Sequence, residues 1–259
     1  MEGNWQRLEV WTDGSVGHIM LNRPEVRNAL DYETVEELER ALRRLEDETR
    51  VILVRGAGGN FCAGADLKYV SANRHEEKTM REFIEQINRA FFRAENASVP
   101  VIAAVEGYAL AGGFELLQAC DIVLVAEDAV LGDQHANFGL MPGGGGTQRL
   151  PRLVGRQRAL GLLLSGEWIG GREAAEWGLA YKAVPAGELE PEALRLAGRL
   201  AERSAEGLRR MKQLVREGLE RPLAEGIGME IEAFCEYIGG VDPEEGLKAF
   251  QERRAPRFA

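Results

Sequence analysis

Strand and helix patterns alternate along the first 146 residues and then give way to helices, and this order most constrains the fold. The apolar run from Val51 to Val54 is typical of a strand that is buried on both faces. Apolar residues recur at spacings of three and four from Tyr32 to Glu48, which predicts a helix with Asp31 as its N-cap. Further strands are expected at residues 8–10, 16–21, 101–105, 122–126 and 129–131, and a further helix at residues 76–95. The alternation predicts a layered α/β body.

The pattern changes after Gly146, where strand signals become scarce. Helices are expected at residues 157–164, 172–178, 191–203, 205–220, 222–238 and 243–253, with one strand at residues 180–184. Proline, glycine and acidic residues cluster between Pro185 and Pro191, which indicates a soft boundary. We therefore expect an α/β core over residues 1–190 and a C-terminal helical region over residues 191–259. This region is short for an independent core, so we expect it to pack on the body or on another subunit.

Charge and cysteine content disfavour several classes of function. The 42 acidic and 32 basic side chains leave a net charge of −10, which argues against nucleic acid as a partner. Cys62, Cys120 and Cys235 form no CxxC pair, so neither a metal site nor a disulfide framework is expected. The longest apolar run, residues 100–126, is interrupted by acids and glycines and is a poor membrane span. The first ten residues lack a secretory signal pattern, and a cytoplasmic protein is expected.

Two short segments combine the end of a strand, glycine and the start of a helix, namely FCAGAD at residues 61–66 and ALAGG at residues 109–113. The first N–H groups of a helix lack intrahelical acceptors and carry the positive end of the helix dipole. Two such groups that converge would polarise a carbonyl and stabilise an oxyanion. The alternative is that these glycines only permit tight turns. The sequence has neither a Walker phosphate loop nor a dinucleotide fingerprint, and no redox cofactor is implied.

Polar residues that could carry chemistry gather between residues 105 and 149. Glu115 falls on the first turn of a predicted helix. Asp133 and His135 interrupt a short apolar strand, and Gly143–Gly146 force a tight turn without side chains. Buried acids and bare backbone are costly for stability, so a functional role is a reasonable hypothesis for this stretch.

Five segments carry a family resemblance in a consistent order: NFCAGADL at 60–67, VEGYALAGGFEL at 105–116, CDIVLVAE at 120–127, GLMPGGGGTQRLPRLVG at 139–155 and EGLKAFQERR at 245–254. From about residue 8 to its end, the chain resembles the enoyl-CoA hydratase/isomerase (crotonase) family. The resemblance implies a crotonase-like spiral of repeated ββα turns that form two roughly perpendicular sheets. It also implies that the C-terminal helical region is an oligomerisation region that builds a homotrimer or a dimer of trimers.

The resemblance further implies how an acyl-CoA substrate is bound. Backbone N–H groups of Ala65 and Gly112 would form the oxyanion hole for the thioester carbonyl, and they lie in the two segments described above. For Arg27 and Arg253 alone, a solvated surface charge is the alternative. Coenzyme A, as part of the substrate, is the only cofactor implied. The resemblance places CoA contacts at Arg27, Ala29, Ala63, Asp66 and Leu67 and, from a neighbouring subunit, at Phe234 and Arg253.

Glu115 matches the first of the two glutamates with which hydratases of the family hold one water. The second glutamate is missing: the family has roughly Phe-Gly-x-Pro-Glu, whereas this chain has LGDQH at residues 131–135, so His135 occupies its place. An imidazole with an ordinary pKa of about 6.5, against about 4.3 for glutamate, can exchange protons near neutral pH. Asp133, two residues earlier on the predicted strand, is expected on the same side and could hold the imidazole or replace the carboxylate. For Glu115, the alternative is a carboxylate that is favoured only by the helix dipole. For His135, the alternative is a structural histidine.

The departure at His135 leaves the reaction open. We expect the addition of water to a 2-enoyl-CoA through an oxyanion-stabilised enolate, with Glu115 and His135 as acid and base. The alternatives are isomerisation, C–C bond hydrolysis or decarboxylation with His135 as base, or a CoA-binding member with little hydratase activity. The acyl pocket is expected to include Tyr69, Val70, Phe114, Phe138 and Leu140, each of which could equally be ordinary core.

Overall fold

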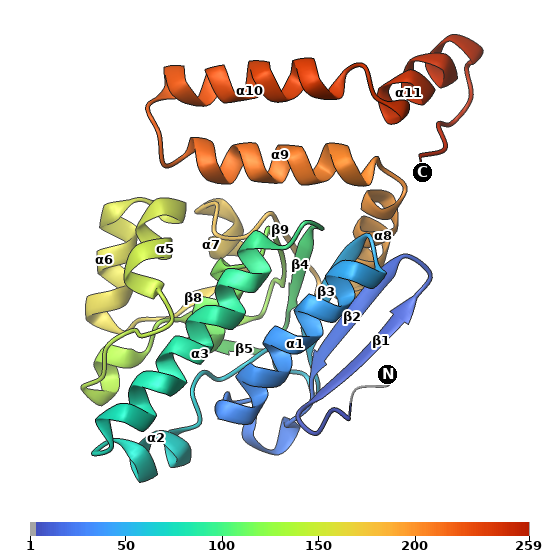
Figure 1. The fold of residues 1–259 in the computed structure, drawn as a ribbon. Coiled ribbons are helices and arrows are strands. Elements are labelled where there is room, and N and C mark those ends of the chain that lie inside the picture. The colour runs from blue at the N-terminus through green and yellow to red at the C-terminus, as the bar shows by residue number, and fades with distance from the viewer. Residues whose placement is uncertain (1–3, 259) are drawn as a thin grey trace.

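The computed structural model describes residues 4–258 and has two sheets covered by helices (Figure 1). The larger sheet has six strands in the order β1–β2–β3–β4–β6–β9, and the smaller has three in the order β5–β7–β8. The strands are β1 (Leu8–Asp13), β2 (Val16–Leu21), β3 (Val51–Gly56), β4 (Val101–Val105), β5 (Tyr108–Leu110), β6 (Ile122–Ala126), β7 (Val130–Gly132), β8 (Ile169–Gly170) and β9 (Lys182–Val184).

Helices connect the strands as far as β9 and form the rest of the chain beyond it. They are α1 (Tyr32–Glu48), α2 (Leu67–Asn73), α3 (Glu77–Asn96), α4 (Gly112–Gln118), α5 (Gly146–Val154), α6 (Arg156–Ser165), α7 (Gly171–Glu176), α8 (Leu189–Ala201), α9 (Ala205–Gly218), α10 (Leu223–Tyr237) and α11 (Val241–Glu252). The N-cap predicted for α1 is confirmed, because Asp31 Oδ1 accepts the Thr34 N–H at 2.8 Å. The apolar stripe of α1 is buried, as its spacing predicts.

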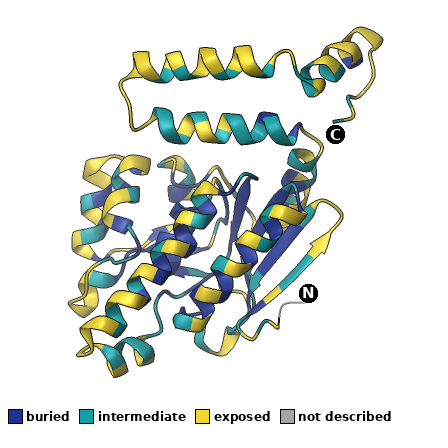
Figure 2. Cartoon of the chain, viewed as in Figure 1, coloured by how far each residue is buried: buried dark blue, intermediate teal, exposed yellow. Residues whose placement is uncertain are grey.

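Successive ββα turns add strands to both sheets. The β1–β2 hairpin is antiparallel, and β2–β3, β3–β4 and β4–β6 then pair in parallel. In the smaller sheet β5 pairs in parallel with β7. Parallel neighbours require long crossover connections, which α1, α3 and α4 supply here. The fold is therefore the α/β spiral that the sequence predicts, and its core lies between the sheets and the inner faces of these helices (Figure 2).

Short elements differ most from the sequence expectation. β5 and β8 were not expected, because runs of two or three residues show little periodicity. The helix start expected at residues 61–66 is confirmed by α2, which begins at Leu67. α5 was also missed, since its glycine-rich start and the internal Pro151 hide the helical pattern. The strand expected at residues 129–131 is β7 at Val130–Gly132, and it ends immediately before Asp133.

The C-terminal helices divide into one that packs on the sheet and three that extend beyond it (Figure 1). α8 packs against β3, β4 and β6. Ser204 ties the other three together: its hydroxyl oxygen accepts from the Gly207 N–H and the Tyr237 hydroxyl, both at 2.9 Å, and it donates to Asp242. Lys212 of α9 reaches the body, where its Nζ lies 2.7 Å from Asp121 Oδ2. The boundary at residue 190 stays a prediction.

None of the helices within residues 4–258 is long and apolar enough to cross a membrane.

Candidate active site

Ala65 and Gly112 bring two backbone N–H groups together from different turns of the spiral. The Cys62 N–H donates to the Tyr108 carbonyl and the Leu110 N–H donates to the Cys62 carbonyl, both at 2.9 Å, so the two segments are paired. A β-carbon placed on Gly112 would lie 3.3 Å from the Ala65 nitrogen. Among the described residues, neither N–H donates to a protein acceptor. Adjacent N–H groups of this kind can polarise a carbonyl oxygen. Their assignment as an oxyanion hole stays a prediction.

A strained residue orients the second of these N–H groups. Ala111, immediately before Gly112, has φ 47° and ψ −118°. A positive φ in a non-glycine residue costs on the order of 1–3 kcal/mol and persists only where the surroundings enforce it. The Ala111 N–H donates to the Gly132 carbonyl at 3.0 Å, so β7 helps to hold the strained conformation. Strain of this kind is concentrated at functional sites.

Glu115 is buried on the first turn of α4, with only 2% of its surface exposed. Its Oε1 accepts the Gly146 N–H at 2.8 Å. Burial is the main reason that the pKa of Glu115 is raised, and the charge of Asp133 adds to the effect. The N–H groups of Gly146 and Gly144 and the charge of His135 lower this pKa without cancelling the increase. Glu115 is therefore held in place as a carboxyl group that protonates more readily than an ordinary one.

Asp133 and His135 form a hydrogen-bonded pair, with His135 Nδ1 2.9 Å from Asp133 Oδ1. The expectation that both lie on one strand is wrong, because β7 ends at Gly132 and His135 begins a 3₁₀ helix. They meet because Gln134 between them adopts a left-handed conformation with φ 63°. The Gln134 side chain secures this turn by donating to the Gly166 carbonyl at 2.8 Å.

Two carboxylates and one imidazole converge beside Gly146. A β-carbon placed on Gly146 would lie 3.2 Å from Glu115 Oε1 and 3.3 Å from Asp133 Oδ2. Asp133 is fully buried, and its Oδ2 has no hydrogen-bond partner among the described residues. Burial on its own lowers the pKa of His135, but the hydrogen bond to Asp133 and the charges of Asp133 and Glu115 outweigh it, so the pKa is raised. A buried, unpaired carboxylate oxygen is costly, which favours a functional role for the cluster.

Sequence reasoning missed the residues that hold the glycine turn. Asn88 Nδ2 donates to the Gly143 carbonyl at 2.8 Å, and Arg149 Nη1 donates to the Gly144 carbonyl at 2.6 Å. Arg149 also makes a two-point ion pair with Glu95, with Nε–Oε1 at 2.6 Å and Nη2–Oε2 at 2.9 Å. Asn88 and Glu95 lie two helical turns apart on α3, a spacing that places both on one face. A polar residue on an amphipathic helix resembles ordinary surface in a sequence, so no signal distinguished them.

The predicted CoA contacts of the N-terminal half come together near Ala65. The Ala63 N–H donates to the Arg27 carbonyl at 2.9 Å. Ala29, two residues after Arg27, is buried. The exposed Arg27 guanidinium lies 4.8 Å from the centroid of the Tyr108 ring. Their contact with CoA stays a prediction.

Asp66 and Leu67 differ in their surroundings. Asp66 caps α2, accepting from the Lys68 N–H at 2.9 Å, and its Oδ2 lies 3.0 Å from Arg23 Nη2. The pKa of Asp66 is lowered because the hydrogen bonds and the Arg23 charge outweigh the largest single influence, burial, which raises it. Asp66 thus has a structural role in addition to the predicted CoA contact. Leu67 is 53% exposed and open to a ligand.

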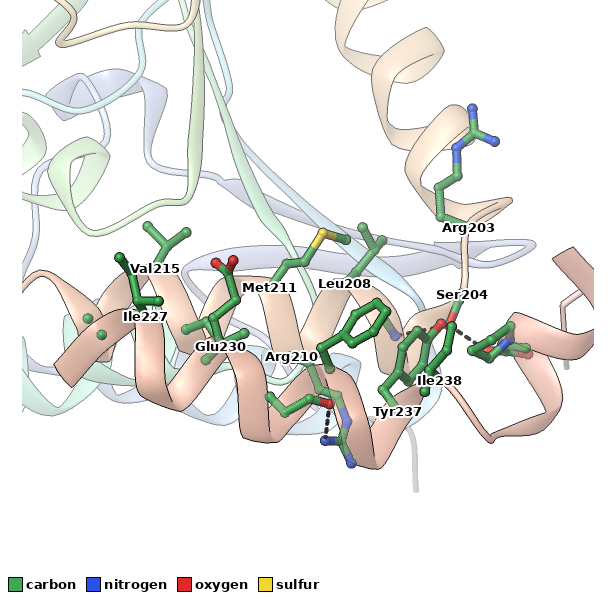
Figure 3. Close-up of a pocket in the computed structure, with 18 of the residues that line it drawn as sticks. Arg203, Ser204, Leu208, Arg210, Met211, Val215, Ile227, Glu230, Tyr237 and Ile238 are labelled. Carbon is green, nitrogen blue, oxygen red and sulfur yellow. Dashed lines mark hydrogen bonds between the residues drawn. The ribbon is translucent and has the colours of Figure 1, made fainter. Parts of the chain in front are cut away.

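Phe234 lies in α10 and Arg253 is the C-cap of α11, two of the helices that extend beyond the body (Figure 1). Phe234 lines a largely apolar groove of about 1010 Å³ that runs between α9 and α10 (Figure 3). This groove contains none of the other predicted site residues. Its wall includes Leu208, Met211, Val215, Ile227, Tyr237 and Ile238. The predicted contact of both residues with CoA of a neighbouring subunit stays a prediction.

The residues expected around the acyl group have different exposures. Phe114 is fully buried in the core. Tyr69 and Val70 are partly buried against the core, with the Tyr69 ring centroid 4.8 Å from that of Phe83. Phe138 and Leu140 follow His135 on the surface, 65% and 43% exposed. They remain candidates for an acyl contact next to the cluster.

The chain matches the family model of the Enoyl-CoA hydratase/isomerase family over residues 12–259. It is 35% identical over 257 residues to a protein of Rhizobium meliloti named "Probable enoyl-CoA hydratase", covering 98% of each chain. It is 38% identical over 250 residues to the "Enoyl-CoA hydratase domain-containing protein 2, mitochondrial" of Mus musculus, covering 94% of this chain and 84% of that protein. A crystal structure of enoyl-CoA hydratase from Bacillus anthracis superposes with a TM-score of 0.93 at 38% identity, covering 98% of this chain and 99% of that one. The chain therefore belongs to the enoyl-CoA hydratase/isomerase family, has the crotonase fold and is an enzyme.

Proposed function

We propose that this enzyme adds water across the C2–C3 double bond of a 2-enoyl-CoA. The observation that carries the proposal is the convergence of Glu115 with the Asp133–His135 pair, one helical turn from the N–H of Gly112. Enoyl-CoA hydratase is also the activity in the names of the relatives at 35–38% identity.

In this mechanism the thioester carbonyl accepts hydrogen bonds from the N–H groups of Ala65 and Gly112. The carbonyl draws electron density from the conjugated double bond, so that C3 becomes electrophilic. Negative charge develops on the oxygen as the enolate forms, where two pre-oriented N–H groups stabilise it most strongly. Because the N–H groups are fixed before the reaction, little reorganisation is needed.

Glu115 and His135 then divide the proton transfers. The Glu115 carboxylate takes a proton from water while the water oxygen bonds to C3, and its raised pKa makes it a better base than an ordinary glutamate. His135, whose raised pKa favours the protonated imidazole, donates a proton to C2. One water has been added in total, and the proton on Glu115 returns to the imidazole for the next turnover. Asp133 holds Nδ1 and thereby leaves Nε2 for the transfer.

A second candidate reaction uses His135 as the base that removes a proton next to the carbonyl. The observation in its favour is the Asp133–His135 hydrogen bond at a position where the family pattern has glutamate. Isomerisation, C–C bond hydrolysis and decarboxylation all pass through an enolate that the same N–H groups would stabilise.

The discriminating experiment follows the ultraviolet absorbance of crotonyl-CoA with purified protein and measures the product mass. Loss of the conjugated absorbance with a gain of one water supports hydration. If the protein binds CoA tightly but crotonyl-CoA is unchanged, the hydratase proposal is wrong. A 3-enoyl-CoA that gains conjugated absorbance without a mass change would assign the protein to isomerisation.

The proposal includes CoA binding and assembly. The exposed apolar side chains of α9, α10 and α11 would be covered in a homotrimer or a dimer of trimers, in which Phe234 and Arg253 contact CoA of a neighbouring subunit. We propose a cytoplasmic location and no cofactor beyond the CoA of the substrate. The Mus musculus relative is among those named as mitochondrial.

A further inference from the structure

We propose that Asn88 is a positioning residue that orients the peptide between Gly143 and Gly144 and thereby the Gly144 N–H next to Glu115. The proposal concerns how Glu115 is prepared for its role, so its catalytic consequence rests on the function proposed above. The effect of Asn88 on the titration of the Glu115 carboxyl group can be measured without catalysis.

The peptide between Gly143 and Gly144 is planar and trans, and it lies between Asn88 and Glu115. In such a peptide the C=O and the N–H point in opposite directions. Asn88 Nδ2 holds the Gly143 oxygen at 2.8 Å, so the Gly144 N–H of the same peptide is directed away from Asn88. Gly144 adjoins Glu115, since a β-carbon placed on Gly144 would lie 2.8 Å from Glu115 Oε2, and the Gly144 N–H lowers the pKa of Glu115. Rotation of this peptide would turn its oxygen toward a carboxylate and its N–H away.

The turn cannot fix this orientation by itself. Gly143–Gly146 have no side chains, and glycine reaches more backbone conformations than any other residue. The neighbouring peptide is held separately, because Arg149 Nη1 donates to the Gly144 oxygen while Glu95 of α3 fixes the guanidinium. α3 therefore holds the turn at two successive carbonyls. Of these two, only the Gly143 carbonyl, which Asn88 contacts, shares its peptide with the Gly144 N–H next to Glu115.

Asn88 is itself well placed for this role. Its Nδ2 also donates to the Ile84 carbonyl at 2.8 Å, which ties the side chain to its own helix. One turn further along α3, Phe91 Cε2 would lie 2.9 Å from a β-carbon on Gly144, so Phe91 and Glu115 confine this glycine. The charged groups that face Glu115 are Asp133 and His135, and neither contacts Asn88. Removal of Asn88 thus leaves those charges unchanged.

Asn96 provides a matched control on the same helix. Its Nδ2 donates to the Phe92 carbonyl at 2.6 Å, the same bond to the fourth preceding residue that Asn88 makes, but Asn96 is exposed and does not reach the turn. We expect Asn88→Ala to lower kcat about tenfold, less than the roughly 10²–10⁴-fold that a whole acid–base group contributes, with KM within about twofold. The acid limb of the pH profile should move upward by about half a unit or more, because a carboxylate that loses a donor is more easily protonated. Asn96→Ala should behave as wild type in both measurements.

A second readout is independent of turnover. Protein labelled with ¹³C at the glutamate carboxyls is titrated by NMR, and Glu115→Gln identifies the Glu115 signal. An upward shift of that titration in Asn88→Ala but not in Asn96→Ala supports the proposal, even if crotonyl-CoA is never hydrated. An unchanged titration, or an equal shift in both variants, overturns it. If Asn88→Ala does not fold, Asn88→Leu retains the volume without the donor and is judged by the same two outcomes.

Discussion

Oδ1 of Asp133 lies 2.9 Å from Nδ1 of His135, and this contact gives the histidine a defined ring orientation at the place where the family pattern has a glutamate. The contact also favours the charged imidazole, because a neighbouring carboxylate raises its pKa against the effect of burial. An imidazolium beside two buried carboxyl groups is a proton donor whose ordinary pKa, about 6.5, lies closer to neutral pH than the value of about 4.3 of a glutamate.

His135→Ala is expected to lower turnover more than about tenfold, because it removes one of the two proposed proton-transfer groups. CoA binding, measured by calorimetry, should change little. The exposed His75 provides the control, and His75→Ala should retain full activity. An unaffected rate in His135→Ala would make His135 a structural residue. In the same series, a gain of hydration in His135→Glu would mean that the native reaction is a different one.

The stability of the protein should depend on pH through His135. Its folded pKa is raised above the unfolded value of about 6.5, so the folded state binds the proton more tightly. The stabilisation of the folded state by this proton is complete below about pH 6.5 and is lost as the pH rises through the folded pKa of His135. Urea unfolding of wild type and His135→Gln should therefore show a larger wild-type advantage at pH 5.5 than at pH 9. A difference that is constant between the two pH values would contradict the assignment.

Glu115→Gln should abolish activity and make the protein more stable near neutral pH. The folded pKa of Glu115 is raised chiefly by burial, so keeping this side chain charged at pH 7 costs folding free energy. A glutamine can still accept the Gly146 N–H without a charge. Calorimetry should show a higher Tm for Glu115→Gln than for the wild type at pH 7. Glu36→Gln, at an exposed position of α1, is the control, and an equal rise there would refute the argument.

Gly144→Ala should reduce activity strongly, whereas Gly161→Ala should not. A β-carbon on Gly144 would lie 2.8 Å from Glu115 Oε2 and 2.9 Å from Phe91 Cε2, so the turn or the carboxylate must move. Gly161 lies within α6 with open space around it, and alanine there should stabilise the helix by up to about 1 kcal/mol. Steady-state kinetics and melting curves of both variants decide this. Wild-type turnover in Gly144→Ala would show that the glycine is not required.

Assembly should depend on the apolar faces of the C-terminal helices. Ile231 of α10 is 56% exposed in the single chain, and Ile231→Asp should shift the proposed homotrimer or dimer of trimers toward monomer in light scattering. Leu164→Asp changes a comparably exposed residue of α6, at 74%, and should leave the assembly unchanged. A wild-type protein that is monomeric at micromolar concentration would contradict the proposed assembly.

The sequence predicts the long elements of the fold well and the details of the site only in part. α1 and β3 follow from a full apolar stripe and a continuous apolar run, which are signals averaged over many residues. Strand alternation predicts the Asp133–His135 contact, yet in the structure the contact arises from the left-handed conformation of Gln134. The sequence does not predict this conformation, because a single backbone angle produces no periodic pattern. Asn88 was missed because its role depends on a peptide 55 residues away in sequence.

The pairing of Cys62 with Tyr108 and Leu110 has a consequence for folding kinetics. It closes a long loop between segments that are far apart in sequence. Such closures occur late in folding, because the chain loses entropy before the new contacts stabilise it. The neighbouring N–H groups of Ala65 and Gly112 are brought together only when this closure is complete. After dilution from denaturant, helical content should therefore recover first, and the proposed capacity to bind a thioester carbonyl should return with the slower phase.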